Sequence, residues 1–256
     1  MTNATEIKPS STQQSSRPEW TSHMGFLLAS LGSAVGLGNI WRFPYVMGKY
    51  GGGAFLLVYM VLMCAICIIP LLCELFMGQK YKKAVVGAYE SVDKRLKSLG
   101  WLNVFTVILI SGFYFAVGGW IIHYVLVYAV GALPHGTDYA SYFNQFAARP
   151  VLPLVYAVLF LAVSAIFPFR GVNSGVEKAN KVMMPAFLIM LLFLVIISQT
   201  LPGAKDGLEF IFKPDFSKFN AEMFLIAFGQ ALFSLSVGMG AMMTYGSYLN
   251  KDTSLV

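Results

Sequence analysis

Residues 32–45 read GSAVGLGNIWRFPY and residues 234–240 read SLSVGMG, so a V-G-x-G core stands inside two separate apolar runs. Glycine lowers helix stability by about 1 kcal/mol relative to alanine, and nearby Ser and Asn side chains compete for backbone hydrogen bonds. We therefore expect both helices to open at these glycines. If the runs cross a membrane, opened backbone is tolerated only where it faces protein or a polar cavity. The two openings together predict a binding site.

Glycines in membrane helices have a second common use, since small residues let two helix backbones pack closely. Either stretch alone also fits that alternative. The pair is more informative, because one stretch lies in the first apolar run and the other in the sixth. This spacing is expected when five helices form a repeat and the sixth begins its inverted copy. The pattern predicts discontinuous helices 1 and 6 whose broken ends meet near the middle of the bilayer.

Composition supports a membrane environment. Hydrophobic residues make up 57% of the 256-residue chain and charged residues 12%, whereas soluble domains hold about 45–50% and about 25%. A helix needs about 20 apolar residues to cross the hydrocarbon core of a lipid bilayer. Six segments approach or exceed that length: residues 23–45, 52–77, 102–131, 151–168, 182–201 and 221–248. We expect an all-α polytopic membrane protein with six transmembrane helices joined by loops.

Basic residues indicate orientation rather than nucleic-acid binding. The formal net charge is +6, but Lys and Arg lie mainly between the apolar runs and form no stripe that could follow a phosphate backbone. They are most frequent in the N-terminal tail and in the second and fourth loops, which marks those regions as cytoplasmic. These patterns predict a multi-pass protein of the cell (inner) membrane with a cytoplasmic N-terminus. Residues 1–16 are expected to form a disordered tail, and residues 17–256 the transmembrane domain.

Several motifs occur in the order known from one family. They are GSAVGLGNIWRFPY at 32–45, GGGAF at 51–55, ELFMG at 74–78, RGVNSGVEKANKVMMP at 170–185 and GQALFSLSVGMGAMMTYGSYLNKD at 229–252. From about residue 17 to its end the chain resembles the neurotransmitter:sodium symporter family, in particular its bacterial amino-acid transporters. The leucine transporter of this family is itself the known example of broken helices within inverted repeats. Members have eleven or twelve membrane helices, so we expect this chain to be an N-terminal half.

The resemblance implies a site for a zwitterionic amino acid between the two openings. The amides of Leu37 and Gly38 would face the substrate carboxylate, where a helix N-terminus favours an anion, and Tyr114 would donate its hydroxyl to the same group. The substrate ammonium would be accepted by three backbone carbonyls, those of Ala34, Phe233 and Ser236. Monoamine transporters of the family carry an aspartate at the position of Gly36, so glycine there favours amino acids.

The side chain of the substrate would lie in an apolar pocket. By resemblance, this pocket includes Ile110, Phe233 and Met239, with its remaining wall on helix eight. The flexible thioether of Met239 stands where other members carry phenylalanine and can adapt to ligands of different shape. Apolar and aromatic amino acids are therefore the expected substrates. Ordinary apolar packing remains an equal alternative for Ile110.

Sodium is the expected co-transported ion. The resemblance implies a first site made by the Ala34 carbonyl, the Asn39 side chain and Ser234, with a further ligand from helix seven. A second site would use the carbonyls of Gly32 and Val35, with its other ligands on helix eight. A hydrogen bond at a helix end is the alternative role for Asn39. Chloride dependence stays open: Tyr59, Gln230 and Ser234 fit a chloride site, but the deciding residue belongs to helix seven.

Further positions match the family's gates and structural supports. Arg42 resembles the outer gate residue, with Gln230 near it. Arg17 and Trp20 resemble a cytoplasmic latch, with Tyr248 beside them, although an isolated Arg17 would more often be a solvated charge. The spacing of Gly175 and Pro185 resembles one linked to unwinding and inward release. A carboxylate within an apolar run usually faces the helix bundle, so Glu74 is expected to brace the amides of an opened helix.

The sequence features favour one of three classes of function. The leading hypothesis is sodium-coupled symport of amino acids by alternating access, which requires no covalent chemistry, so the chain is not expected to be an enzyme. The second is a truncated, inactive fragment of such a transporter, or one that works only with a complementary half. The third, an unrelated channel or receptor, explains neither the paired V-G-x-G stretches nor the ordered motifs.

Overall fold

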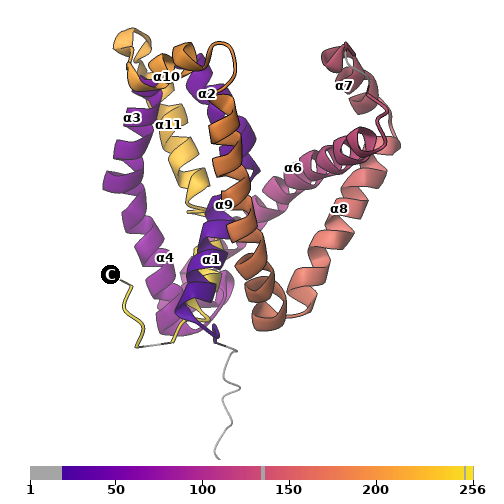
Figure 1. The fold of residues 1–256 in the computed structure, drawn as a ribbon. Helices are drawn as coiled ribbons and strands as arrows, with labels where there is room; N and C mark the ends of the chain where they lie inside the picture. Colours follow the sequence, from indigo (N-terminus) through magenta and orange to yellow (C-terminus); the bar gives the residue numbers. More distant parts are fainter. Residues whose placement is uncertain (1–18, 134–135, 251, 256) are drawn as a thin grey trace, which may run out of the picture.

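The computed structural model describes residues 19–133, 136–250 and 252–255, and within these residues all regular secondary structure is helical. The all-α prediction is therefore confirmed. Residues 1–16, predicted as a tail, and Arg17 lie outside the described residues. Figure 1 shows a bundle from which α6 and α8 diverge to one side.

The first apolar run is interrupted at the quoted glycines. It consists of α1 (His23–Ala34), a π-helical turn η1 (Gly38–Arg42) and α2 (Phe43–Lys49). Ser22 caps α1 by accepting a hydrogen bond from the Gly25 amide, which satisfies one of the free amides at the helix start. The two parts of the run meet at an angle of 48°.

The second and third runs are long helices. The second contains α3 (Gly53–Leu62), the π-helical turn η2 (Met63–Cys67) and α4 (Ile68–Tyr81), which stops at Lys82 in a left-handed conformation with φ 53°. The third is α6 (Lys97–Ala129). Between them lie α5 (Val85–Val92) and the short η3 (Lys94–Leu96).

The fourth and fifth runs are consecutive helices joined by a short connection. They are α8 (Leu152–Phe169) and α9 (Lys178–Ser198), the latter preceded by the π-helical turn η4 (Val172–Glu177). The predicted start of the fifth helix at residue 182 was wrong by about ten residues, because the charges at 177, 178 and 181 resemble a loop. Glu177 and Lys181 in fact pair within the helix at 2.7 Å, and such i,i+4 pairs support a helix.

The sixth run is split. α11 (Ala221–Ser234) ends before residues 235–240, and α12 (Ala241–Gly246) follows them. Ser236, Gly238 and Gly240 all have positive φ, between 54° and 80°. Repeated left-handed residues cannot continue an α-helix, so the chain leaves helical geometry within the V-G-x-G stretch.

The expectation of plain loops between the runs was wrong at three places. α5 lies in the second loop, α7 (Tyr139–Ala147) in the third and α10 (Ala204–Phe212) in the fifth, where the 3-10 turn η5 (Phe216–Lys218) follows it. These helices have only eight or nine residues. They are too short to cross a membrane, and a search for long apolar runs does not detect them.

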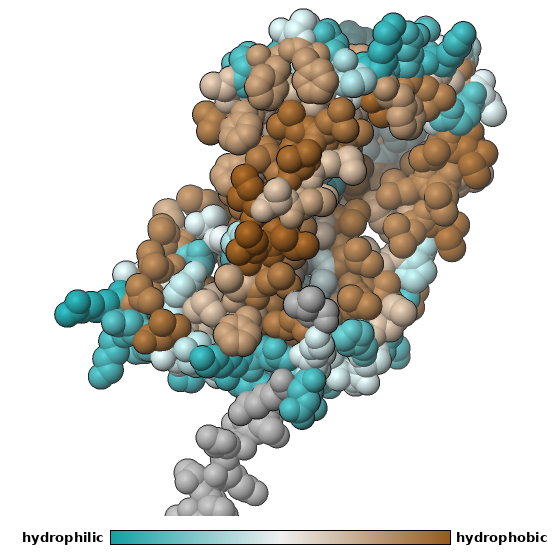
Figure 2. Space-filling view, turned by 90° about the vertical axis from the view of Figure 1, so that its left-hand side faces the viewer, coloured by the Kyte–Doolittle hydropathy of each residue, from teal (hydrophilic) through white to brown (hydrophobic). Residues whose placement is uncertain are grey.

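The surface has the character of a membrane protein. Within the described residues, four helices are long and apolar enough to span a membrane, or five if the bent pair α1 and η1–α2 counts as one; α11 is shorter. None of the described residues of α8 or α9 is buried. Figure 2 shows apolar side chains over the middle of one face and hydrophilic ones toward both ends. The chain is a multi-pass membrane protein.

Two contacts hold the split sixth run against the second apolar run. α11 packs on α3 and η2 through a buried cluster that includes Phe55, Cys67 and Met223. α12 lies directly on α4, where glycines replace side chains: a Cβ on Gly78 would lie 1.9 Å from the Met243 carbonyl oxygen, and one on Gly246 would lie 2.4 Å from that of Leu75. Reciprocal glycines therefore allow the two backbones to touch.

Candidate functional site

A cavity of about 290 Å³ lies beside both breaks. Most of the residues predicted to bind substrate line it: Ala34, Gly38, Ile110, Tyr114, Phe233, Ser236 and Met239. Asn39 and Ser234, predicted sodium ligands, also line it. Leu37 does not; its side chain lines a separate apolar groove next to α6. The structure thus gathers residues that are about 200 positions apart in the chain.

The wall from α6 is one face of a helix. Val107 and Ser111 are four residues apart, and so are Ile110 and Tyr114, so these side chains lie above one another on one face of α6. Of these four residues, only Ile110 and Tyr114 were predicted, although this spacing could have indicated the other two. Four further lining residues were not predicted: Ser33, Phe115, Phe160 and Ala241. Gly36, expected to favour an amino-acid substrate, lines the cavity as well. Phe160 lies on α8, and no local pattern placed that helix at the site.

Two glycines of the first break make room for aromatic rings. A Cβ on Gly36 would lie 3.2 Å from the Tyr114 hydroxyl, and one on Gly38 would lie 2.2 Å from the Phe233 ring. The rings of Tyr114 and Phe233 themselves are 6.2 Å apart. Gly38 therefore allows the Phe233 ring to lie against the open backbone, and Gly36 leaves the Tyr114 hydroxyl a few tenths of an ångström more room than alanine would.

The first break is joined to α11 by polar groups. The Asn39 side-chain nitrogen donates to the Ala34 carbonyl at 2.6 Å. The Asn39 side-chain oxygen accepts from the Ser234 hydroxyl at 2.5 Å and from the Gln230 side-chain nitrogen at 3.3 Å. Three oxygens thus converge at the end of α1. They belong to the three residues predicted for the first sodium site.

The two residues assigned to the second sodium site lie at the end of α1. Gly32 faces α9, since a Cβ there would lie 2.3 Å from the Asn180 side-chain oxygen. Val35 follows the last residue of α1, and its amide donates to the Leu31 carbonyl at 2.7 Å. Neither residue lines the cavity.

The second break is held from two sides. The hydroxyls of Ser33 and Ser236 are 3.1 Å apart, and Ser236 also donates to the Ser33 carbonyl at 3.3 Å. On the other side, the Gly238 amide donates to the buried Glu74 carboxylate at 2.7 Å. A carboxylate from α4 therefore satisfies a backbone amide that the opening of the helix leaves without a helical partner.

Arg42 and Gln230 lie above the cavity, toward the end where α2 finishes. The Arg42 guanidinium donates to the Gln230 side-chain oxygen at 2.8 Å, and Gln230 is fully buried. Gln230 also donates weakly to Ser234 at 3.4 Å. Tyr59, also considered for chloride, packs on Phe43 with ring centroids 4.8 Å apart.

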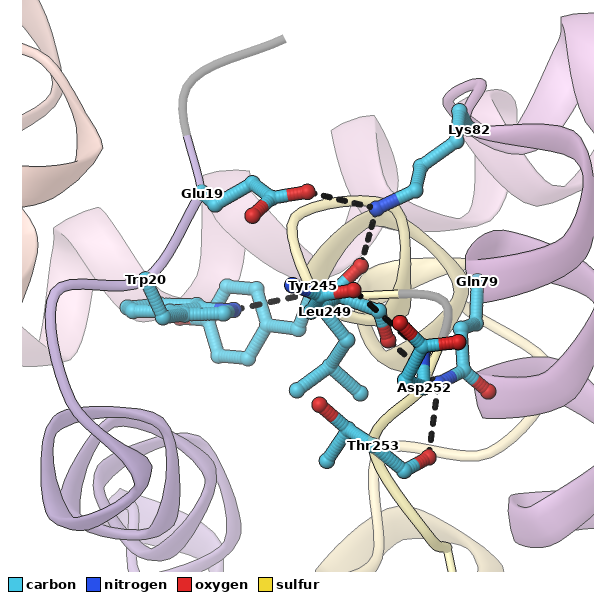
Figure 3. Close-up of polar contacts among 9 residues, drawn as sticks. Glu19, Trp20, Gln79, Lys82, Tyr245, Leu249, Asp252 and Thr253 are labelled. Atoms are coloured by element: carbon cyan, nitrogen blue, oxygen red, sulfur yellow. Dashed lines mark hydrogen bonds and ion pairs between the residues drawn. The ribbon is translucent and has the colours of Figure 1, made fainter.

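At the opposite end, Trp20 connects the beginning of α1 to the end of α12. The Trp20 indole donates to the Tyr245 carbonyl at 3.1 Å (Figure 3). The Trp20 backbone amide donates to the Tyr248 carbonyl, also at 3.1 Å. The rings of Trp20 and Tyr248 are 6.2 Å apart. Two residues that the sequence analysis missed, Lys82 and Gln79, bind the segment after α12. Lys82 contacts Glu19 and the Leu249 carbonyl, and Gln79 donates to the carbonyls of residues 250 and 253.

Gly175 and Pro185 both belong to the fifth run. Gly175 is buried in η4, where a Cβ would lie 2.0 Å from the Phe167 carbonyl oxygen. Pro185 is exposed inside α9. Because proline has no amide hydrogen, it removes one helical hydrogen bond there. The run therefore has a wide turn at its start and a weakened ladder in its interior.

Comparison with known proteins agrees with this arrangement. The model of the sodium:neurotransmitter symporter family matches residues 17–150 and 151–256. The sodium-dependent transporter YhdH of Bacillus subtilis, named as uncharacterized, is 39% identical over 93% of this chain and 53% of its own length. The rat sodium-dependent neutral amino acid transporter B(0)AT3 is 30% identical over 97% of this chain and 45% of its own length.

A solved structure shares the fold. The crystal structure of MhsT in complex with L-phenylalanine matches with a TM-score of 0.85 and 43% sequence identity, covering 93% of this chain and 55% of MhsT. The chain thus spans about half the length of the proteins it matches. With a family match over nearly the whole sequence, the chain belongs to the sodium:neurotransmitter symporter family.

Proposed function

We propose that this chain forms the N-terminal part of a sodium-coupled amino-acid transporter, with six membrane crossings of which the first and sixth are discontinuous. The observation that supports this most is the meeting of both breaks at one cavity, where Asn39, Ser234 and the Ala34 carbonyl converge. Opened backbone offers amides and carbonyls without the cost of burying a charged side chain. Such groups suit a ligand that carries both an ammonium and a carboxylate.

The substrate is proposed to be an apolar or aromatic amino acid. Its carboxylate binds the Leu37 and Gly38 amides at the start of η1 and the Tyr114 hydroxyl. Its ammonium binds the carbonyls of Ala34, Phe233 and Ser236. Its side chain lies against Ile110, Phe233 and Met239, in a cavity that Phe115 and Phe160 also line. The L-phenylalanine bound by MhsT, 43% identical to this chain, supports this substrate class.

Sodium is proposed as the co-transported ion. A hard cation prefers oxygen ligands, and the Ala34 carbonyl, the Asn39 side chain and the Ser234 hydroxyl supply three. Asn39 now donates to Ala34 and accepts from Ser234, so cation binding replaces these hydrogen bonds. Gly32 and Val35 contribute carbonyls to a second site. Tyr59, Gln230 and Ser234 leave a role for chloride open.

Alternating access needs a closure on each side of the cavity. Arg42 with Gln230 is proposed as the outer closure. Trp20 with Tyr248, together with Arg17, is proposed as the cytoplasmic one, and unwinding between Gly175 and Pro185 opens the inward path. This places the N-terminus in the cytoplasm and the chain in the cell (inner) membrane. The basic residues near the ends of α4 and α8 and at the beginning of α9 support that orientation.

A second candidate is that the chain alone is inactive and works only with a complementary half. Its support is a mostly apolar groove of about 1040 Å³, lined by Leu37, Ile40 and Trp41 on one side and by aromatic residues of α6 on the other. Large apolar patches of this kind can mark sites where another protein segment binds. In the related transporters the other half of the chain is available to fill such a surface.

Uptake measurements separate these candidates. Labelled leucine, phenylalanine and tryptophan are offered to proteoliposomes with a sodium gradient or with potassium replacing sodium. Sodium-dependent uptake by this chain alone supports the first candidate. Uptake only after co-reconstitution with the C-terminal half of a related transporter supports the second. Sodium-independent uptake, or no binding of any of these amino acids in either preparation, refutes sodium-coupled amino-acid transport.

A further inference from the structure

A groove between α6 and α8 lies apart from the cavity. It has a volume of about 620 Å³ and is lined by both helices and by residues 147–150, at the end of α7 and just after it. Figure 1 shows α7 at the end of the molecule where α6 finishes and α8 begins. Of the described residues that line the groove, Phe115 alone also lines the cavity, and Trp120 alone also lines the larger apolar groove. The groove is therefore a separate surface.

The walls of this groove are apolar stripes. Along α6, Gly112, Ala116 and Trp120 are four residues apart in succession and share one helix face. The facing stripe of α8 consists of Leu154, Val158 and Leu161. At a rise of about 1.5 Å per residue, the stripe of α6 is about 12 Å long. Its inner end is empty, because a Cβ on Gly112 would meet nothing within 4 Å.

The groove is preformed, because α6 and α8 are already in close contact beside it. A Cβ on Gly119 would lie 2.5 Å from the Ala157 amide nitrogen, and one on Gly118 would lie 2.6 Å from the Phe160 ring. The two helices therefore cannot approach each other further to fill the groove. A ligand that enters it does not have to separate them.

One cation stands at the α7 end of the groove. Arg149 follows α7 and lines the groove, and its exposed side chain has no hydrogen bond or ion pair with any described residue. It is also the only Lys or Arg between residues 130 and 169. A guanidinium binds the oxygens of a phosphate through a planar fork of N–H donors. The groove therefore combines apolar walls with a single site for an anionic group.

Trp120 lies between the charged end of the groove and its apolar interior. Its ring packs edge-on against Phe143 of α7, with ring centroids 5.0 Å apart. Tryptophan is enriched where lipid headgroups meet the hydrocarbon core. From α7 toward the middle of α6, a ligand therefore meets a cation, then an indole, then apolar side chains. A phospholipid presents its phosphate, its ester region and its acyl chain in the same order.

We propose that this groove binds one phospholipid of the leaflet on the side of α7, with its phosphate on Arg149 and one acyl chain along the stripe from Trp120 to Gly112. An apolar protein segment would also cover the two stripes, but it would leave Arg149 without an anion. The proposal goes beyond transport and does not depend on it. Binding alone can therefore test it.

The test measures the binding of added lipid to the full chain by native mass spectrometry from detergent. Three probes are compared: phosphatidylglycerol, the diacylglycerol with the same chains but no phosphate, and inorganic phosphate without chains. The first phosphatidylglycerol should bind about tenfold more tightly than the diacylglycerol, the gain of one charge-assisted hydrogen bond, and inorganic phosphate should not be retained. Equal binding of the two lipids, or binding of inorganic phosphate as tight as that of phosphatidylglycerol, overturns the proposal.

Two substitutions address the two parts of the site. Arg149→Gln should weaken phosphatidylglycerol binding by about tenfold and leave diacylglycerol binding unchanged. Its control is Arg170→Gln, the same change at an exposed arginine that follows α8. Gly112→Leu should fill the groove and weaken the binding of both lipids by about tenfold or more. Its control is Gly229→Leu in α11, because a Cβ there also meets nothing within 4 Å.

Equal weakening of phosphatidylglycerol binding by Arg149→Gln and Arg170→Gln indicates diffuse attraction to a basic protein and overturns the proposal. Equal lipid affinities of Gly112→Leu and Gly229→Leu overturn it as well. If Gly112→Leu melts at a lower temperature than Gly229→Leu, the two arginine variants decide, because both change only an exposed side chain. Loss of the bound lipid on co-reconstitution with the C-terminal half of a related transporter assigns the groove to a protein segment and also overturns the proposal.

Discussion

The backbone contact between α4 and α12 gives a quantitative prediction for Gly78→Ala. The new Cβ would lie 1.9 Å from the Met243 carbonyl oxygen and 2.8 Å from the Ser247 amide nitrogen. Bringing the first distance to the 3.0 Å below which real Cβ contacts essentially never occur requires a displacement of about 1.1 Å. Neither neighbour is a rotatable side chain, so the helices themselves must separate.

Overpacking of this kind costs about 1–3 kcal/mol, and we expect the upper end because both contacts are to backbone. Replacing glycine by alanine inside a helix also returns about 1 kcal/mol. The net destabilisation for Gly78→Ala is therefore about 2 kcal/mol. Gly112→Ala in α6 is the matched control, because a Cβ there meets nothing within 4 Å, and it should stabilise by about 1 kcal/mol.

The assay is thermal unfolding of both variants in the same detergent. A difference of about 3 kcal/mol between them corresponds to about 6–12 °C in the midpoint for a chain of this size. The parent chain should melt between the two variants. If Gly78→Ala melts at or above the temperature of Gly112→Ala, α4 and α12 do not touch as described, and the reasoning is refuted.

Three further predictions concern the cavity and its supports. Asn39→Ala should raise the sodium concentration needed for binding of labelled tryptophan by about 10- to 150-fold, because it removes one bond to a charged group. The control is Asn144→Ala, at an exposed residue of α7. An unchanged sodium dependence in Asn39→Ala would exclude Asn39 as a ligand. Gly38→Ala places a carbon 2.2 Å from the Phe233 ring, so it should push the ring into the cavity and weaken amino-acid binding by about tenfold or more. Gly229→Ala is the control, because its added carbon meets nothing within 4 Å. Equal affinities in the two variants would contradict the placement of the ring. Glu74→Ala should cost about 1–3 kcal/mol more than Glu74→Gln in thermal unfolding, because only glutamine keeps an acceptor for the Gly238 amide; equal melting of the two would show that the brace contributes nothing.

The membrane-spanning helices were predictable because burial in lipid requires long apolar runs. The interruptions at residues 35–37 and 235–240 were predictable because glycine, Ser and Asn weaken a helix locally. The short helices α5, α7 and α10 were not found, since eight or nine mixed residues leave no such signal. The start of the fifth run was misplaced because Glu177 and Lys181 resemble a solvated loop until their pairing is known.

Some residues of the candidate site were predictable from the sequence and others were not. Asn39, Ser234 and Phe233 belong to stretches whose composition or family motif marks them directly. Phe160 could not be recognised, because its importance depends on which helix lies beside it. Outside the site, the contact of Glu177 with Thr21, 156 positions away, is likewise a property of the folded chain that no local pattern contains.

The glycines where α4 and α12 touch also restrict how this protein can diverge. A side chain at position 78 or at position 246 would separate the same two helices, so tolerance at one position depends on the residue at the other. Substitutions there should appear in pairs across species, or together with a shift of residues 241–246 along α4. A sequence alignment of relatives would reveal this as linked variation between two positions that are 168 residues apart.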